Sequence, residues 1–396
     1  PTVSSISTPA PNASPGNFTY TVTFSESVTG LTADDFRNAS TATGCTFTPA
    51  SSSGTTVTVT ATGCSSGGVA IKLASGSVSD LAGNTGPATA YTATVVRNGT
   101  RQQPQFKINS LGSTPYTWVD AVNYTGDDRG GMAITTQKVL LTGDTYMGRF
   151  DLSNLGSPAA AISNAPASWP DGLASDLRTR TAYSFDGPNY GAGSGMTGTV
   201  TGLTQLDPAT GLQTSTKVTL SQPISLLAGS TIGVFSGYGR IVLWAGGTNP
   251  RVYDIEMPSG IVDDLGVRAA PAARTLAETP GNTSWGTAEY FDGQLYLNYV
   301  ESQTRIVRMK VSDGTTTTLG SFPNGLGDMA SFTVDPSTNR WYFHFENSAP
   351  TFPGGTNETI GFSVASFTTG PGATWGATPS TPTSASSLTF PLDFST

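Results

Sequence analysis

The chain has 396 residues, including 47 Gly and 26 Pro, and a formal net charge of −8 at pH 7. At about 150 residues per domain, this length predicts two or three domains. Charged residues make up 12% of the chain, and no basic surface is available to neutralise phosphates, which argues against nucleic-acid binding. The sequence contains no apolar run of the about 18 residues that a membrane-spanning helix needs. A single histidine, His344, argues against most histidine-based catalytic and metal sites, and the composition against a typical enzyme.

The chain begins at Pro1 without an initiator Met or a signal sequence, so we expect a mature fragment or a piece of a longer protein. Its two cysteines, Cys45 and Cys64, lie at the ends of a predicted hairpin with residues 51–54 at the tip. Antiparallel pairing about this tip places the two sulfurs opposite each other. A disulfide is typical of an exported protein, and two free buried thiols are the alternative.

Residues 1–97 predict a small all-β domain. Phe18, Tyr20, Val22 and Phe24 alternate with threonines, which indicates a strand with one apolar face and one hydroxyl face. The same alternation recurs along the segment, with turns about every ten residues. About seven short strands in this length predict a two-sheet sandwich.

Two motifs in this segment resemble those of bacterial Ig-like repeats. The run from Thr23 to Phe36, TFSESVTGLTADDF, is similar to the core motif of such repeats, and Val78 to Asn84, VSDLAGN, is similar to their later turn. The resemblance covers nearly all of residues 1–97. It implies an Ig-like sandwich and a place in a large exported surface protein or adhesin, but no particular activity.

Residues 125–370 contain a repeated pattern of strand, turn and strand. The second strands of the repeat are predicted to begin at Lys138, Arg180, Arg240, Gln294 and Arg340, with an average spacing of about 50 residues. A strand-rich unit of this length is typical of a β-propeller blade. The fold class is therefore all-β, an N-terminal Ig-like β-sandwich followed by a five-bladed β-propeller, with six blades as the alternative.

The ends of the second domain predict how its ring closes. Residues 98–124 are a predicted connector with a possible ring-closing strand at 116–119, and we expect a short, exposed joint at 97–103. Residues 371–396 form a Pro/Ser/Thr-rich linker with a second possible ring-closing strand at 388–392. Pairing of N-terminal with C-terminal strands would close the ring.

The second domain also resembles propellers of exported bacterial proteins. The resemblance rests on Gly126 to Ile134, GDDRGGMAI, followed by Thr142 to Asp144, TGD. It covers the first blade well and the other blades by periodicity alone. It implies an association with Ig-like repeats in long surface proteins and no specific activity.

The candidate ligand-binding residues lie where the predicted inner strands begin. Carboxylates at these positions converge on one mouth of a propeller and would favour a cation, a polyol or, as a carboxylate pair, glycoside hydrolysis; the alternative is that each acid caps its own turn. Two tryptophans near the same positions offer stacking surfaces for sugars, with blade packing as the alternative. The set is Asp128, Arg129, Asp171, Trp169, Trp285 and Asp328.

The most plausible metal is calcium, because oxygen ligands are the only kind that this sequence offers in quantity. Asp34, Asp35 and Asp80 are the candidate ligands, and solvated loop carboxylates are the alternative. No cofactor is required by any motif. We expect His344 to be a structural histidine within a strand.

These patterns predict a non-enzymatic, exported bacterial cell-surface protein in which an Ig-like spacer presents a propeller. The propeller would bind a glycan or a protein, as in an adhesin. One alternative is a structural subunit of a surface layer or filament that associates with itself, and a second is a glycan-active hydrolase or lyase.

Overall fold

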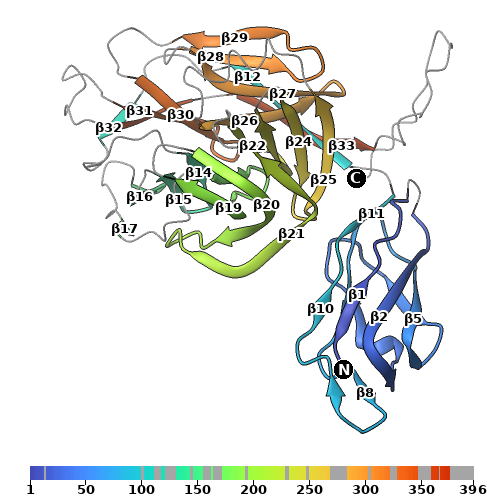
Figure 1. Cartoon of the computed structure of the whole chain (residues 1–396). Coiled ribbons are helices and arrows are strands. Elements are labelled where there is room, and N and C mark those ends of the chain that lie inside the picture. The colour runs from blue at the N-terminus through green and yellow to red at the C-terminus, as the bar shows by residue number, and fades with distance from the viewer. Residues whose placement is uncertain are drawn as a thin grey trace, which may run out of the picture.

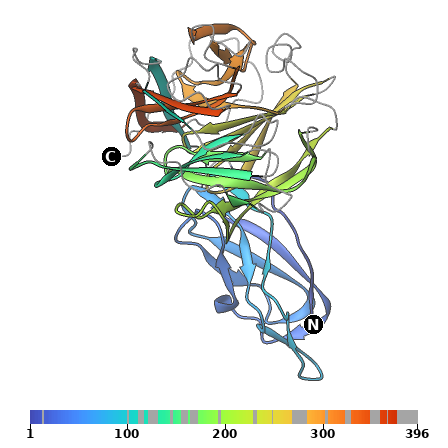
Figure 2. The same ribbon diagram turned by 90° about the vertical axis from the view of Figure 1, so that its left-hand side faces the viewer.

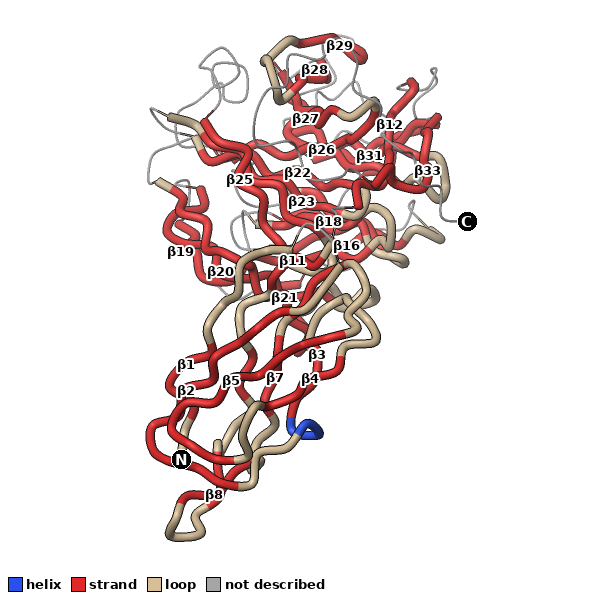
Figure 3. The backbone as a smooth tube through the Cα atoms, turned by 90° about the vertical axis from the view of Figure 1, so that its right-hand side faces the viewer, coloured by secondary structure: helices blue, strands red, loops and turns tan. Residues whose placement is uncertain are grey.

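A computed structural model of the chain describes residues 1–12, 15–99, 102–110, 117–120, 131–142, 146–154, 162–163, 172–191, 195–227, 232–246, 249–267, 283–301, 305–321, 328–346, 358–364 and 366–374. Within these ranges the regular elements are strands, apart from one 3-10 turn, η1 (Ala33–Asp35) (Figure 3). The predicted all-β fold class is confirmed. Two bodies are visible in Figures 1 and 2, an elongated N-terminal domain and a larger ring of sheets.

The N-terminal domain is a β-sandwich. One layer is a six-stranded sheet in the order β4-β5-β2-β8-β9, with β1 also paired to β2; the other layer contains the sheets β10-β7-β3 and β11-β6. The strands of the first layer are β1 (Val3–Ile6), β2 (Phe18–Thr29), β4 (Thr46–Pro49), β5 (Ser53–Thr62), β8 (Val78–Asp80) and β9 (Thr85–Gly86). Those of the second are β3 (Phe36–Asn38), β6 (Gly67–Val69), β7 (Ile71–Leu73), β10 (Tyr91–Thr92) and β11 (Val96–Asn98).

Alternation along β2 explains the core of this sandwich. Phe18, Tyr20, Val22 and Phe24 are buried, as predicted, while the threonines between them lie on the outer face. They pack against apolar residues of the second layer such as Ile71. Burial of this apolar face, at about 25 cal/mol per Å² removed from water, holds the two layers together.

The predicted disulfide between Cys45 and Cys64 is present. The strands β4 and β5 pair with Thr46 opposite Thr62, which brings the flanking cysteines together at one end of the hairpin. Cys64 is buried in the sandwich core. The disulfide therefore joins the edge strand β4 to the core of the domain.

Replacing both cysteines, Cys45→Ala with Cys64→Ala, should lower the free energy of unfolding of the N-terminal domain by about 3 kcal/mol, because the unfolded chain regains loop entropy. Calorimetry of the full chain measures the shift of the N-terminal transition. The variant Ser51→Ala with Ser53→Ala, at the tip of the same hairpin, is the control. Native protein with two alkylatable thiols would contradict the disulfide.

The second domain contains five groups of strands, or blades, each with four strands in the described part of the chain. In blade 3 the first strand packs against a three-stranded antiparallel sheet, and parallel pairing of that first strand joins blades 2, 3 and 4. Blade 1 contains β14 (Met132–Ile134), β15 (Lys138–Thr142), β16 (Tyr146–Asp151) and β17 (Ile162–Ser163); blade 2 contains β18 (Leu173–Asp176), β19 (Thr181–Gly191), β20 (Gly195–Leu206) and β21 (Gln213–Leu226); blade 3 contains β22 (Ile232–Gly237), β23 (Arg240–Ala245), β24 (Arg251–Glu256) and β25 (Ile261–Val267); blade 4 contains β26 (Thr283–Phe291), β27 (Gln294–Glu301), β28 (Arg305–Lys310) and β29 (Thr316–Ser321); blade 5 contains β30 (Asp328–Asp335), β31 (Arg340–Glu346), β32 (Glu358–Val364) and β13 (Thr117–Asp120).

The first strands of the blades surround a common centre. Each contacts the next in the order β14, β18, β22, β26 and β30, and β30 contacts β14 again. Figure 1 looks onto this ring, with blade 4 at the top, blade 5 at the left and blade 3 at the right. The arrangement is that of a five-bladed β-propeller rather than the six-bladed alternative.

Strands from both ends of the domain complete the ring. β13 precedes blade 1 in the sequence but pairs with β32 as the outer strand of blade 5. β12 (Gln102–Ser110) pairs antiparallel with β33 (Ser366–Thr374), and β12 also pairs with β26 of blade 4 through Phe106 and Tyr290. The second predicted closing strand, at 388–392, lies outside the described residues.

Candidate binding site at the domain junction

The two domains are joined by an ion-pair network centred on Arg97. This residue lies on β11, and its guanidinium donates to Glu256 at the end of β24 (2.6 Å) and to Asp263 on β25 (3.2 Å). Its side chain is only 15% exposed. Charge-assisted hydrogen bonds that are partly shielded from water are stronger than those at an open surface. The network therefore holds the last strand of the sandwich against blade 3.

Apolar packing accompanies these ion pairs. Ala70, Val95 and Ile261 form a small buried cluster across the junction. Beside it, a Cβ atom at Gly68 would lie 2.9 Å from the Val95 side chain and 3.2 Å from the Cβ of Ser259 in the turn between β24 and β25. Glycine permits this close approach of the domains. The prediction of an exposed joint at 97–103 is therefore wrong at Arg97, whose side chain is largely shielded, and at Asn98, which is fully buried.

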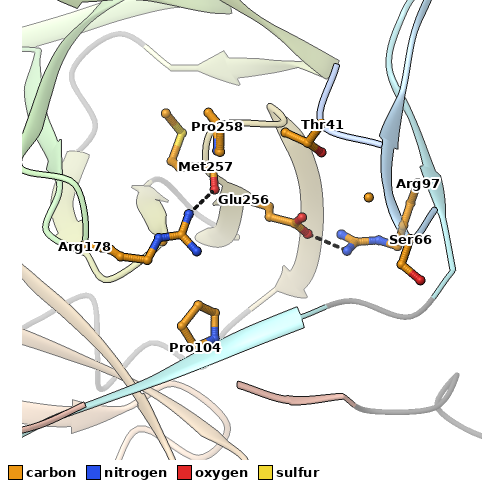
Figure 4. A pocket seen from close by; sticks show the side chains of 10 residues that line it. Thr41, Ser66, Arg97, Pro104, Arg178, Glu256, Met257 and Pro258 are labelled. Carbon is orange, nitrogen blue, oxygen red and sulfur yellow. Dashed lines mark hydrogen bonds and ion pairs between the residues drawn. The ribbon is translucent and has the colours of Figure 1, made fainter. Parts of the chain in front are cut away.

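A pocket of about 190 Å³ opens beside this network (Figure 4). Its walls come from both domains: Thr41, Ser66, Gly67 and Arg97 from the sandwich, and Pro104, Arg178, Gly239, Glu256, Met257 and Pro258 from the propeller. Clefts between domains are frequent ligand sites. The pocket combines apolar proline surfaces with three charged side chains.

Arg178 is held in place at one side of the pocket. Asp176, which is buried at the end of β18, accepts hydrogen bonds from the backbone N–H groups of Arg178 (2.9 Å) and Gly239 (2.8 Å). The Arg178 Nη2 donates to the carbonyl oxygen of Met257 (3.1 Å). Burial raises the pKa of Asp176, although the Gly239 N–H and the Arg178 charge oppose this rise. These contacts fix the guanidinium in the orientation that Figure 4 shows.

Replacing Arg97 with Met should loosen the junction, because the loss of hydrogen bonds between charged groups costs about 2 kcal/mol. Backbone hydrogen exchange at residues 67–70 and 256–261 should then become faster. Arg37→Met, at an exposed arginine of the same domain, is the matched control. Equal exchange in the two variants would show that the Arg97 network does not hold the domains together.

A second polar cluster lies deep in the ring, between blades 4 and 5. Ala288 and Tyr290 pack against blade 3, so alternation along β26 turns Thr287 and Glu289 toward blade 5. Glu289 accepts hydrogen bonds from Arg308 (2.7 Å), from the backbone N–H of Ile108 (3.1 Å) and from Asn298. Arg308 also donates to the Ile108 carbonyl oxygen (2.7 Å). This pair of charges therefore clamps the backbone of β12 onto blade 4.

The protonation of Glu289 is coupled to the stability of the fold. Burial raises the pKa of its carboxyl group, while Arg308, the Ile108 N–H and Asn298 act in the opposite direction. Because the pKa in the folded protein exceeds the unfolded value of about 4.3, the folded protein binds more protons in the interval between them. The free energy of unfolding should therefore fall as the pH rises through that interval.

Comparison of the wild-type protein with Glu289→Gln isolates this contribution. Relative to the variant, the wild-type protein should lose stability as the pH rises above about 4.3. Denaturant unfolding at a series of pH values measures the difference, and Glu26→Gln, at an exposed carboxylate, is the control. Parallel stability curves for the wild type and Glu289→Gln would contradict the raised pKa.

The single histidine also lies in blade 5. His344 is 1% exposed, and its cross-strand neighbour is Ser331, which is fully buried. A serine nucleophile needs a base but also access to its substrate. The burial of both side chains favours a structural role for this pair, consistent with the expectation for His344.

The predicted ligand-binding residues of the propeller lie at the edge of the described structure or beyond it. Asp128, Arg129, Trp169 and Asp171 are outside the described residues. For Trp285 and Asp328 only the backbone is described, on β26 and at the start of β30. Their role as a binding set stays a prediction.

The candidate calcium ligands of the sandwich belong to separate turns. Asp35 accepts hydrogen bonds from the backbone N–H (2.7 Å) and hydroxyl (2.8 Å) of Thr32. Asp80 accepts from Ala82 (2.9 Å) and from the backbone and side chain of Asn84 (both 2.8 Å), contacts that lower its pKa. Asp34 is exposed. The described residues contain no cluster of three or more potential metal-ligating His, Cys, Asp or Glu side chains, and calcium binding stays a prediction.

Comparison with known proteins supports the first domain. Residues 1–96 match the sequence model of the bacterial Ig-like domain family, which confirms the resemblance for this part of the chain. No curated protein matches the sequence. Among the described residues, no helix has the length and hydrophobicity needed to cross a membrane.

Solved structures similar to the chain share little sequence with it. They include a protein of unknown function from Bacteroides thetaiotaomicron (13% identity, 92% of this chain and 98% of that chain covered, TM-score 0.33). A putative exported protein from Bacteroides fragilis is 7% identical over 63% of this chain and 95% of its own (TM-score 0.32). A GH43_1 enzyme from Xanthomonas citri complexed with xylotriose is 14% identical over 65% and 90% (TM-score 0.35). Scores this low support no conclusion about the function of this chain.

Proposed function

We propose that this chain is a non-enzymatic binding module of an exported bacterial surface protein. The Ig-like domain acts as a spacer that holds the propeller in one orientation, and the uncovered end of the propeller binds a glycan or a protein. The match to the bacterial Ig-like family and the disulfide support this proposal, because disulfides form in oxidising, extracytoplasmic compartments.

The observation that carries the proposal is the end of the propeller at which the Ig-like domain docks. In a four-stranded antiparallel blade, the first and third connections lie at one end and the second connection lies at the other. The junction uses the first connections of blades 2 and 3, at Arg178 and Gly239, and the third connection of blade 3, at Met257 and Pro258. The Ig-like domain therefore leaves the opposite ends of the blades uncovered.

We expect the predicted ligand-binding carboxylates at that opposite end. The first strands of blades 1, 2 and 5 start at that end, and in the sequence Asp128 and Asp171 precede two of them while Asp328 begins the third. Loops carried by a rigid scaffold are common binding surfaces. A mouth with several carboxylates would suit a polyhydroxylated or cationic ligand, including calcium.

Glycan-array binding by the full chain tests this proposal. We expect binding to one glycan class, and a loss of at least about tenfold in affinity on replacing Asp128 and Asp328 with Asn, because hydrogen bonds to charged groups contribute about 1.5–3 kcal/mol. Asp313→Asn, in the third connection of blade 4 at the other end, should bind as the wild type does.

The other outcomes would distinguish among the alternatives. Binding to proteins of a surface extract but to no glycan would favour the protein partner. Concentration-dependent self-association would favour the surface-layer or filament alternative. Turnover of a bound glycan would favour the hydrolase or lyase alternative, and the absence of any binding and any self-association would contradict the proposal.

A further inference from the structure

We propose that the junction pocket is a second binding site, separate from the uncovered end of the propeller. Its ligand is a carboxylate that also carries hydroxyl groups and has about the size of one sugar ring, such as a uronic acid residue. The pocket holds about 190 Å³ and has walls from both domains. Three features of its walls carry this assignment.

The first feature is the Nη1 group of the Arg178 guanidinium. Its Nη2 donates to Met257 and lies 3.8 Å from an Asp176 oxygen, whereas Nη1 and Nε have no hydrogen-bond partner among the described residues. Figure 4 shows the second terminal nitrogen directed toward the space between Pro104 and Glu256. Nη1 and Nε lie on different edges of the guanidinium, so they cannot bind one carboxylate together, but Nη1 can donate a charge-assisted hydrogen bond to it.

A glycine in the wall of the pocket keeps this Nη1 group accessible. Gly239 has a φ of +71°, and a Cβ atom there would lie 3.0 Å from Pro104 and 3.5 Å from the Arg178 Nη1. A side chain at this position would press against the guanidinium and fill part of the space in front of it. Glycine thus permits the turn between β22 and β23 and leaves the Arg178 Nη1 accessible.

The second feature is a hydrogen-bond acceptor on the facing wall. Glu256 uses Oε2 to accept from Arg97, and Oε1 has no hydrogen-bond partner among the described residues. Arg97 is itself neutralised by Glu256 and Asp263. A ligand that carries only a carboxylate would leave this acceptor unused, whereas a sugar hydroxyl can donate to it.

The third feature is the apolar surface of the pocket. Pro104 and Pro258 present rigid rings that suit the C–H groups of a sugar. Ser66 and Thr41 of the Ig-like domain place hydroxyl groups on the remaining side. Carboxylate, hydroxyl and C–H groups occur together in uronic acids, while an acidic peptide lacks the hydroxyl donors around a ring.

Isothermal titration of the full chain with glucuronate, glucose and acetate tests the ligand class. Glucuronate should bind, and glucose and acetate should each bind at least about tenfold more weakly, since each lacks one set of contacts. Polygalacturonate as a further probe separates a free sugar acid from a polymer-borne residue, because only a chain-end or looped residue of the polymer fits a pocket of this size.

Variants of Arg178 test the residue assignment. Arg178→Met should reduce glucuronate affinity by about tenfold or more, and Arg178→Lys should retain part of it, because charge remains without the planar fork. Arg251→Met, at the other end of the strand that carries Glu256, is the matched control and should bind as the wild type does. If no ligand bound at the uncovered end of the propeller, these results for the junction pocket would be unchanged. The two proposed sites are therefore tested independently.

A spectroscopic measurement on the wild-type protein tests the same site without relying on the folding of a variant. In the wild-type protein, the ¹H–¹⁵N signal of the Arg178 Nε should shift on addition of glucuronate, while that of Arg251 should not. No glucuronate or polygalacturonate binding to the wild type, or equal affinity of the wild type and Arg178→Met, would overturn the proposal.

Discussion

The contact between Arg97 and the two carboxylates of blade 3 is the constraint on which the functional geometry depends. Arg97 is nearly the last residue of the sandwich, and its partners Glu256 and Asp263 lie on successive strands of blade 3. One guanidinium thus joins the edge of one domain to two strands of the other. Because the side chain is largely shielded from water, removing either partner leaves a poorly solvated charge, which favours one arrangement of the domains.

The propeller has its own requirement, the closure of a ring that contains a buried polar cluster at one of its blade contacts. Apolar clusters join blades 1 and 2, blades 2 and 3, blades 3 and 4, and blades 5 and 1. Between blades 4 and 5, Ile306 belongs to the apolar cluster of blade 5, and the ring also contains the buried Glu289 with its partner Arg308. The inserted strand β12 lies there too, and its Phe106 stacks on Tyr238 and Phe367. The strand that follows the Ig-like domain is therefore also part of the ring, so docking and ring closure involve the same segment.

Much of the fold could be predicted from the sequence because strands and turns depend on residues that are close together in the chain. The second strands of four blades begin at the predicted residues, including Arg240 and Arg340. Alternation and turn residues can be recognised within a window of about ten residues, so these strands could be predicted from the sequence. The Cys45–Cys64 disulfide follows from one hairpin. In contrast, Arg97 and Glu256 are 159 positions apart, and no period or motif links them. The junction pocket depends on that long-range contact, so it could not be predicted from the sequence. The predicted ligand-binding residues of the propeller lie largely outside the described ranges.

The central claim, that the Ig-like domain and the propeller form one body of fixed orientation, is tested most directly by a distance distribution between the domains. Spin labels at the exposed positions Thr58 of the sandwich and Thr317 of blade 4 can be measured by pulsed electron resonance on the full chain. A fixed junction predicts one narrow distance distribution that broadens in Arg97→Met. A broad distribution in the unmodified protein, equal to that of the variant, would contradict the account.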